Sequence, residues 1–260
     1  MQDEESLLNY LEAGGKLSSP DNATPRYRGE VMRFMAVFVD SEMAGASGFA
    51  DCINRAPGLR ERIIAARTVL EKFSHAEQVL RLMEQFGAQT TLYISAHQWE
   101  ARLERDAALG DQRGSRDMRL SVFYYPIQGW EDAMVLQFLM GRATVIQLDE
   151  TSRCSYQPLA DVMLGILLAE KRHAELGEEG VRQALESGRD HAPVQASVDY
   201  WYPRVAATFG QAASDHFEKY RQYGLRQRSN EELLGLWQAE TVSALDKLRL
   251  HIPDTRPLRG

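Results

Sequence analysis

Residues 162–177 read VMLGILLAEKRHAELG, and this stretch decides the fold. Its first eight residues, Val162 to Ala169, form the longest apolar run of the chain, far shorter than the roughly 20 residues that span a membrane. Glu170 ends this run and His173 follows three residues later, so the two side chains share one helix face. Because burying a lone carboxylate is costly, the pattern predicts that Glu170 has a cationic or metal partner.

A Glu-x-x-His motif on a helix is one part of the carboxylate-bridged di-iron site found in some four-helix bundles. That site needs two such motifs and one carboxylate from each of two further helices, because bridging carboxylates hold two metal ions and each ion takes an imidazole. The motif alone is also common on solvent-exposed helices. The other helices must therefore supply matching side chains.

Helical periodicity covers most of the chain and predicts an all-α fold. A short helix within residues 1–24 precedes a long one at about 25–54, for which Thr24 provides a cap and Pro25 suits the first turn. Capping-box spacing between Ser229 and Glu232 marks the start of the last helix. The further helices are expected at about 58–86, 95–109, from 130 onward, 157–187, 193–209, 211–224 and 230–249, and residues 120–125 have strand character. We expect one domain over residues 1–260, with a core bundle at about 25–187 and a helical extension at about 190–250.

Partner side chains for Glu170 are found on two of these helices. Glu42 interrupts an apolar face of the helix at 25–54, and His75 lies on the next helix. At the offset of three from His75 the residue is Lys72, and Glu71 lies four residues before His75. These residues form either part of a metal site or a solvated, hydrogen-bonded face.

A carboxylate on the helix that begins near residue 130 is harder to choose. Glu131 and Asp132 point about 100° apart on a helix, so one of them faces the core. Both share a face with apolar residues, and periodicity leaves the choice open.

Charge and composition exclude several classes of protein. The formal net charge of −7 opposes nucleic-acid binding. The two cysteines, Cys52 and Cys154, form no metal or redox motif and are expected to be buried thiols. The acidic N-terminus lacks a signal sequence, which predicts a cytoplasmic protein without membrane association.

Three stretches resemble the catalytic subunit of the phenylacetyl-CoA epoxidase family, whose members are ferritin-like di-iron carboxylate proteins. Residues 27–87 place a carboxylate helix, an Asn-Arg-Ala-Pro turn and a histidine helix in the order of that family. Residues 129–147, GWEDAMVLQFLMGRATVIQ, resemble its Trp-x-Asp helix and favour Asp132 as the inward carboxylate. Residues 151–177 resemble its Arg-x-Ser-Tyr turn and Glu-x-x-His helix.

The resemblance implies a ferritin-like four-helix bundle with extra C-terminal helices. It also implies two iron ions, a ferritin-like partner subunit, a reductase, an oligomeric assembly, and a small aromatic or acyl-CoA substrate that receives an oxygen atom from O₂. Carried over position by position, the metal ligands are Glu42, His75, Asp132, Glu170 and His173.

One position departs from the family pattern, because Lys72 stands where a carboxylate is expected. An ammonium group has no lone pair for a metal and carries its own positive charge. Two interpretations remain open at this point. In the first interpretation, one or two iron ions bind, Lys72 and Glu71 lie at the reacting centre, and the chain is a monooxygenase subunit. Alternatively, Lys72 forms salt bridges with the buried carboxylates, no metal binds, and the chain is a scaffold or regulatory subunit.

Overall fold

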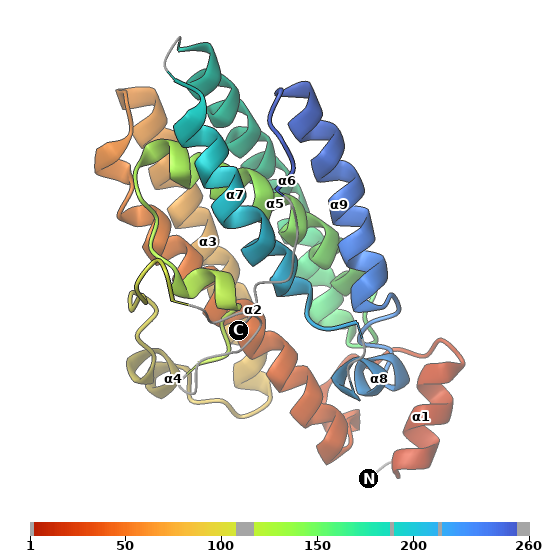
Figure 1. The fold of residues 1–260 in the computed structure, drawn as a ribbon. Helices are drawn as coiled ribbons and strands as arrows, with labels where there is room; N and C mark the ends of the chain where they lie inside the picture. The colour runs from red at the N-terminus through yellow and green to blue at the C-terminus, as the bar shows by residue number, and fades with distance from the viewer. Residues whose placement is uncertain (1–2, 108–116, 188–189, 213–214, 254–260) are drawn as a thin grey trace.

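Four long helices form the centre of the computed structural model, which describes residues 3–107, 117–187, 190–212 and 215–253. They are α2 (Pro25–Ala50), α3 (Leu59–Gln85), α5 (Trp130–Thr151) and α6 (Gln157–Glu186) (Figure 1). In sequence order, α2 and α3 form one helical hairpin and α5 and α6 form a second. Within the described residues, the β-structure consists of one isolated bridge between Leu17 and Tyr156. The predicted all-α fold is confirmed.

The helix ends follow the capping signals in the sequence. The Thr24 hydroxyl accepts a hydrogen bond from the Tyr27 amide at 3.3 Å, and Pro25 occupies the first position of α2. Gly87, directly after the C-cap of α3, has a φ of 92°, a conformation that favours glycine. Ser229 and Glu232 form the predicted capping box of α9.

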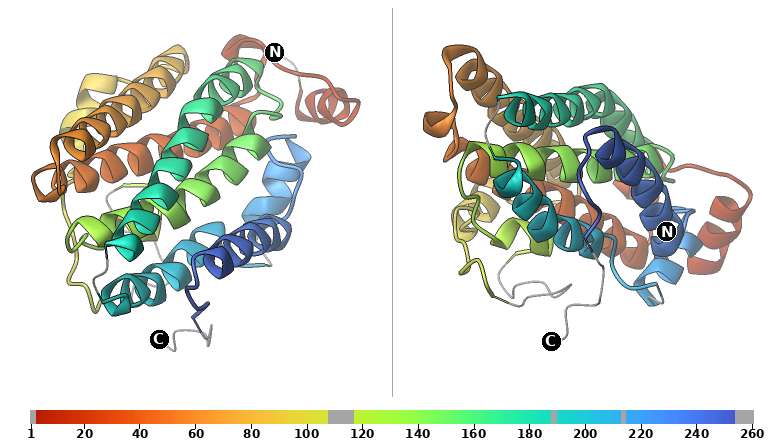
Figure 2. Two further views of the ribbon diagram at one scale, coloured as in Figure 1. Left: turned by 90° about the horizontal axis from the view of Figure 1, so that it is seen from above. Right: turned by 45° about the horizontal axis from the view of Figure 1, so that its top comes forward.

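The remaining helices lie around the two hairpins. α7 (Ala192–Ala206) and α9 (Asn230–Lys247) pack against α5, whereas α1 (Glu4–Glu12) and α8 (Asp215–Gln222) lie together near one end (Figures 1 and 2). Helix α5 is consequently covered on several sides, which explains why its apolar residues are spread around its circumference. Short 3₁₀ turns occur at Pro20–Asn22 (η1), Ile53–Arg55 (η2), Ser121–Tyr124 (η3) and Ala207–Phe209 (η4).

One predicted helix is wrong, and the loop segment with strand character forms no strand. The helix expected at about 95–109 is instead a short helix, α4 (Thr90–Ala96), followed by irregular chain to residue 107, and residues 108–109 lie outside the described part. The buried Arg119 guanidinium donates to the carbonyls of Gln98, Trp99 and Ala101, which keeps those carbonyls out of a helical ladder. The segment with strand character, Leu120–Tyr125, contains the 3₁₀ turn η3 because no neighbouring strand is present among the described residues to pair with it.

Helices α5 and α6 approach each other at glycines. A Cβ atom on Gly177 would lie 2.4 Å from the Phe138 amide nitrogen, and one on Gly141 would lie 2.9 Å from the Ala174 Cα. These contacts set the axial register between the two helices, with Gly141 level with Ala174. Among the described residues, no helix combines the length and the apolar character that crossing a membrane requires.

Candidate metal centre

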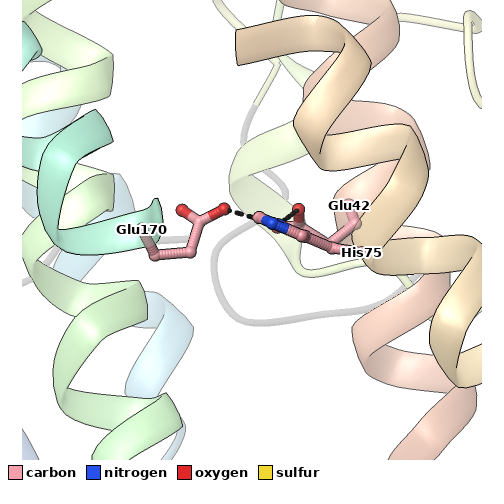
Figure 3. Close-up of side chains that lie close together, drawn as sticks. All are labelled: Glu42, His75 and Glu170. Atoms are coloured by element: carbon pink, nitrogen blue, oxygen red, sulfur yellow. Dashed lines mark hydrogen bonds and ion pairs between the residues drawn. The ribbon is translucent and has the colours of Figure 1, made fainter. Parts of the chain in front are cut away.

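Three helices bring the predicted polar residues to one buried place between the hairpins. Glu42 comes from α2, Lys72 and His75 come from α3, and Glu170 and His173 come from α6. Glu170 and His173 are fully buried, and Glu42, His75 and Lys72 are at most 8% exposed. Figure 3 shows Glu170 facing Glu42 and His75 from the opposite helix. The burial inferred from the sequence pattern around Glu170 is thus present in the structure.

The Lys72 ammonium lies between the two glutamates. Its Nζ is 3.2 Å from Glu42 Oε1 and 3.5 Å from Glu42 Oε2, and it is 3.2 Å from both Glu170 oxygens. An ammonium donates up to three hydrogen bonds and accepts none, so it suits a position surrounded by carboxylate oxygens. Lys72 therefore bridges α2 and α6 from the intervening helix α3.

His75 adds a second positive group to the same cluster. Its Nδ1 lies 3.1 Å from Glu170 Oε1 and 3.5 Å from Glu42 Oε2. Burial lowers the pKa of His75, but hydrogen bonds to Glu170 and Glu42 and their negative charges outweigh burial and raise the pKa to about 9. This raised pKa favours the imidazolium form of His75 beside the two carboxylates.

The same charges act on Glu170 and Lys72. Burial alone raises the pKa of the Glu170 carboxyl, yet Lys72 and hydrogen bonds from His173 and His75 hold the pKa well below its usual range. Burial also lowers the pKa of Lys72, and the two glutamates more than reverse this and raise the pKa. Two carboxylates and two cations consequently balance each other inside the bundle.

His173 and Glu71 extend the cluster toward the surface. His173 Nδ1 lies 3.2 Å from Glu170 Oε1, and His173 Nε2 lies 2.6 Å from Glu71 Oε2. Arg172 donates to the other Glu71 oxygen at 2.6 Å. Glu71 therefore binds His173 and Arg172 and does not enter the position that Lys72 occupies.

A comparison with known proteins supplies the family. The sequence model of the family described as "Phenylacetic acid catabolic protein" matches residues 5–260. The chain belongs to this family. It is also 23% identical over 259 residues to one of the subunits of 1,2-phenylacetyl-CoA epoxidase from Escherichia coli (strain K12), and the match covers 98% of this chain and 78% of that relative. The ferritin-like bundle implied by the resemblance agrees with this membership.

Asp132 is the one predicted ligand that the structure does not bring to the cluster. Its two oxygens accept hydrogen bonds from Arg105 at 2.8 and 2.9 Å, from Trp201 Nε1 at 2.9 Å and from the Gln128 amide at 2.8 Å. Asp132 precedes Gly141 by nine residues, so it lies about 13 Å further along the α5 axis than the level of Ala174. It is buried, as predicted, but its surroundings are an arginine site and not the glutamate cluster.

At the level of the cluster, α5 supplies no acidic group. The cavity beside Lys72 is lined on this side by Gln137, Met140, Gly141 and Thr144. Sequence reasoning missed Gln137, which is buried, because an amide on an apolar helix carries no charge signal. It also missed Arg105, because this residue follows a short helix in an irregular segment whose periodicity indicates nothing about its partner.

The residues present do not fit a pair of iron ions. Among the described residues, the one group of potential ligands whose atoms lie within 4.8 Å of one another is Glu42, His75 and Glu170. Lys72 Nζ lies within hydrogen-bond distance of both glutamates of this group, and His75 donates to Glu170. Two metal ions would need further carboxylates, and both the Lys72 position and the α5 position lack one.

Proposed function

We propose that this chain is a metal-free, ferritin-like subunit that stabilises or regulates a catalytic partner in phenylacetate-type catabolism. The observation that carries the proposal is the Lys72 ammonium, 3.2 Å from oxygens of both Glu42 and Glu170. A positive group is thereby placed between the carboxylates that would otherwise hold a cation.

Electrostatics supports this function over metal binding. A metal ion at this position would have to displace the ammonium or bind next to it, and the desolvated repulsion between the two cations is costly. A neutral lysine could act as a ligand, but the two glutamates raise the pKa of Lys72, which opposes deprotonation. The folded state therefore favours the internal salt bridge.

The relative supports the proposed assembly. The Escherichia coli protein is named as one component of an epoxidase with several chains, and it is similar to this chain over almost all of the chain. We propose that this chain likewise works beside a second ferritin-like subunit, in an oligomer that receives electrons from a reductase and acts on a small aromatic or acyl-CoA substrate. In that assembly the chemistry belongs to the partner.

A second candidate function rests on the Glu42, His75 and Glu170 group. Its potential ligand atoms lie within 4.8 Å of one another, as a single metal ion requires. If iron bound there it would supply O₂ activation, and the chain would be the monooxygenase subunit itself. Within this candidate, Glu42 and Glu170 would neutralise the ion and Lys72 would have to leave the position between them.

Metal analysis of the purified protein separates the two candidates. After expression in iron-replete medium, the scaffold function predicts less than about 0.1 equivalent of iron in the wild-type protein. Lys72→Glu removes the ammonium and adds the expected carboxylate, and we expect it to raise the metal content. Lys171→Glu, an exposed change next to Glu170, serves as the control. Iron near one or two equivalents in the wild-type protein would overturn the scaffold function.

A further inference from the structure

Two neighbouring cavities lie along α5 between the level of Met140 and its C-terminal end. The first has a volume of about 600 Å³ including its opening, and its walls are mostly apolar, with Phe38, Phe123 and Met163 among them. The second, of about 340 Å³ including its opening, contains the polar side chains of Arg226, Glu150 and Thr208 in its lining. Both cavities are lined by the same three side chains, at which they meet: Phe34, Gln147 and Thr151.

The side-chain amide of Gln147 has an unsatisfied hydrogen-bond donor where the two cavities meet. Its Nε2 is buried and has no hydrogen-bond partner in the described structure. Buried polar atoms are nearly always satisfied, and an exception at the wall of a cavity indicates a missing partner, either an ordered water or a ligand atom. The partner must be an acceptor, because an amide NH₂ only donates.

The Arg226 guanidinium lines the second cavity and forms hydrogen bonds with neutral groups. Its guanidinium donates to Asn230 Oδ1 at 2.8 Å and to the Arg228 carbonyl at 3.3 Å, and it lies over the Phe217 ring at 5.5 Å. All three partners are neutral, and among the described residues no carboxylate forms an ion pair with it. Burial lowers the pKa of Arg226, and the nearby charge of Glu150 offsets this only in part.

Glu150 also lines the second cavity, but its carboxylate already has hydrogen-bond donors and an arginine as partners. Its Oε1 accepts hydrogen bonds from the backbone amides of Gln227 and Arg228 at 2.5 and 2.8 Å, and its Oε2 lies 3.8 Å from Arg228 Nε. These donors offset the negative charge of Glu150. The second cavity therefore presents an arginine and an amide NH₂ to an acceptor group.

We propose that the two cavities bind one elongated amphipathic monocarboxylate, such as a medium-chain fatty acid. Its carboxylate accepts hydrogen bonds from Arg226 and Gln147, and its apolar chain extends along α5 into the first cavity. From Thr151 to Met140 the helix rises about 16 Å, which suits a dodecanoate-sized chain. A site with apolar walls and a few converging polar groups is the usual form of a small-molecule pocket.

The carboxylate end of this site is separate from the cluster around Lys72. Glu42 lines the far end of the first cavity, but neither Arg226 nor Gln147 contacts the Lys72 cluster. The proposal therefore stands whether or not Lys72→Glu gains metal.

Dodecanoate binding to the full-length protein, measured by isothermal titration calorimetry, tests the proposal directly, with dodecan-1-ol as the uncharged comparison. We expect saturable one-to-one binding of dodecanoate that is tighter than binding of the alcohol.

Variants locate the ligand. Arg226→Gln should weaken dodecanoate binding about tenfold or more, because a charge-assisted hydrogen bond is lost, and it should leave dodecan-1-ol binding unchanged. Thr144→Trp fills the first cavity and should abolish binding of both ligands. If that variant does not fold, Met140→Phe gives a milder filling of the same wall. Arg221→Gln, an exposed arginine that does not line either cavity, is the matched control and should bind like the wild type.

Two results would overturn the proposal. The first is no saturable binding of dodecanoate by the folded wild-type protein. The second is binding that Arg226→Gln and the cavity-filling variant leave unchanged, which would place the ligand elsewhere on the protein.

Discussion

The Lys72 ammonium lies 3.2 Å from both carboxylate oxygens of Glu170, on the helix across the bundle. Both side chains are buried, and the pair connects the α2–α3 hairpin to the α5–α6 hairpin. Removal of one member of such a pair leaves the other as an uncompensated buried charge, which costs more than the pair contributed.

Lys72→Met should lower the free energy of unfolding by about 3 kcal/mol, because Glu42 and Glu170 then face each other without the ammonium. Urea denaturation monitored by circular dichroism measures the change. Lys171→Met, at an exposed position of α6, should stay within about 0.5 kcal/mol of the wild type. Adding Glu170→Gln to Lys72→Met should recover part of the loss, and equal stability of the two lysine variants would contradict the buried pair.

His75 should remain protonated well above neutral pH. Its pKa is raised from 6.5 to about 9, so its stabilising contribution is complete below about pH 6.5 and is lost as the pH rises through about 9. The stability difference between the wild type and His75→Gln should therefore shrink between about pH 6.5 and 9.5. NMR titration of the His75 ring checks the same value, and a midpoint near 6.5 would show that the glutamates do not hold the proton.

Asp132 should stabilise the fold without taking part in metal binding. Burial raises the pKa of the Asp132 carboxyl, but hydrogen bonds from Arg105 and the Gln128 amide lower it below 3.8. Its contribution is therefore present above about pH 4 and is lost as the pH falls through the lowered pKa. Asp132→Asn should cost about 2 kcal/mol at pH 7 and progressively less in acid, as urea denaturation across this pH range would measure.

The Lys72→Glu background gives Asp132 a second test. If Asp132 only pairs with Arg105, adding Asp132→Asn to Lys72→Glu should leave the iron content of that variant unchanged. Loss of iron in the double variant would instead mean that Asp132 reaches the metal site.

Substitution by alanine at two glycines of α6 should change the stability of the protein in opposite directions. Gly177→Ala should destabilise by about 2 kcal/mol, because its Cβ would lie 2.4 Å from the Phe138 amide nitrogen and force α5 and α6 apart. Gly165→Ala, on the same helix with no atom within 4 Å of the new Cβ, should stabilise by about 0.5–1 kcal/mol through helix propensity. Thermal unfolding of both variants measures the contrast, and parallel shifts would contradict the close helix contact.

The sequence predicts the long helices well because their ends carry local signals. Thr24 with Pro25, and Ser229 with Glu232, cap helices at the predicted positions. The apolar run before Glu170 likewise indicates a buried carboxylate, because burial follows from the neighbours on the same helix face. These inferences need information from one helix only.

Asp132 shows where such reasoning ends. Periodicity reports the direction in which a side chain points around its helix, and Asp132 does point inward. It does not report the level along the axis, which depends on the contact of Gly141 with Ala174 in another helix. The helix prediction for the segment after α4 fails for a related reason. Arg119, more than ten residues away in sequence, donates hydrogen bonds to the carbonyls of that segment.

Lys72 gives the protein a counter-ion that is covalently part of its own chain. No chelator can extract it, and no delivery pathway has to load it before the core closes. Under this view, the protein would fold equally well in cells starved of iron and in cells rich in it, and it could be ready for assembly before a metal-dependent partner matures.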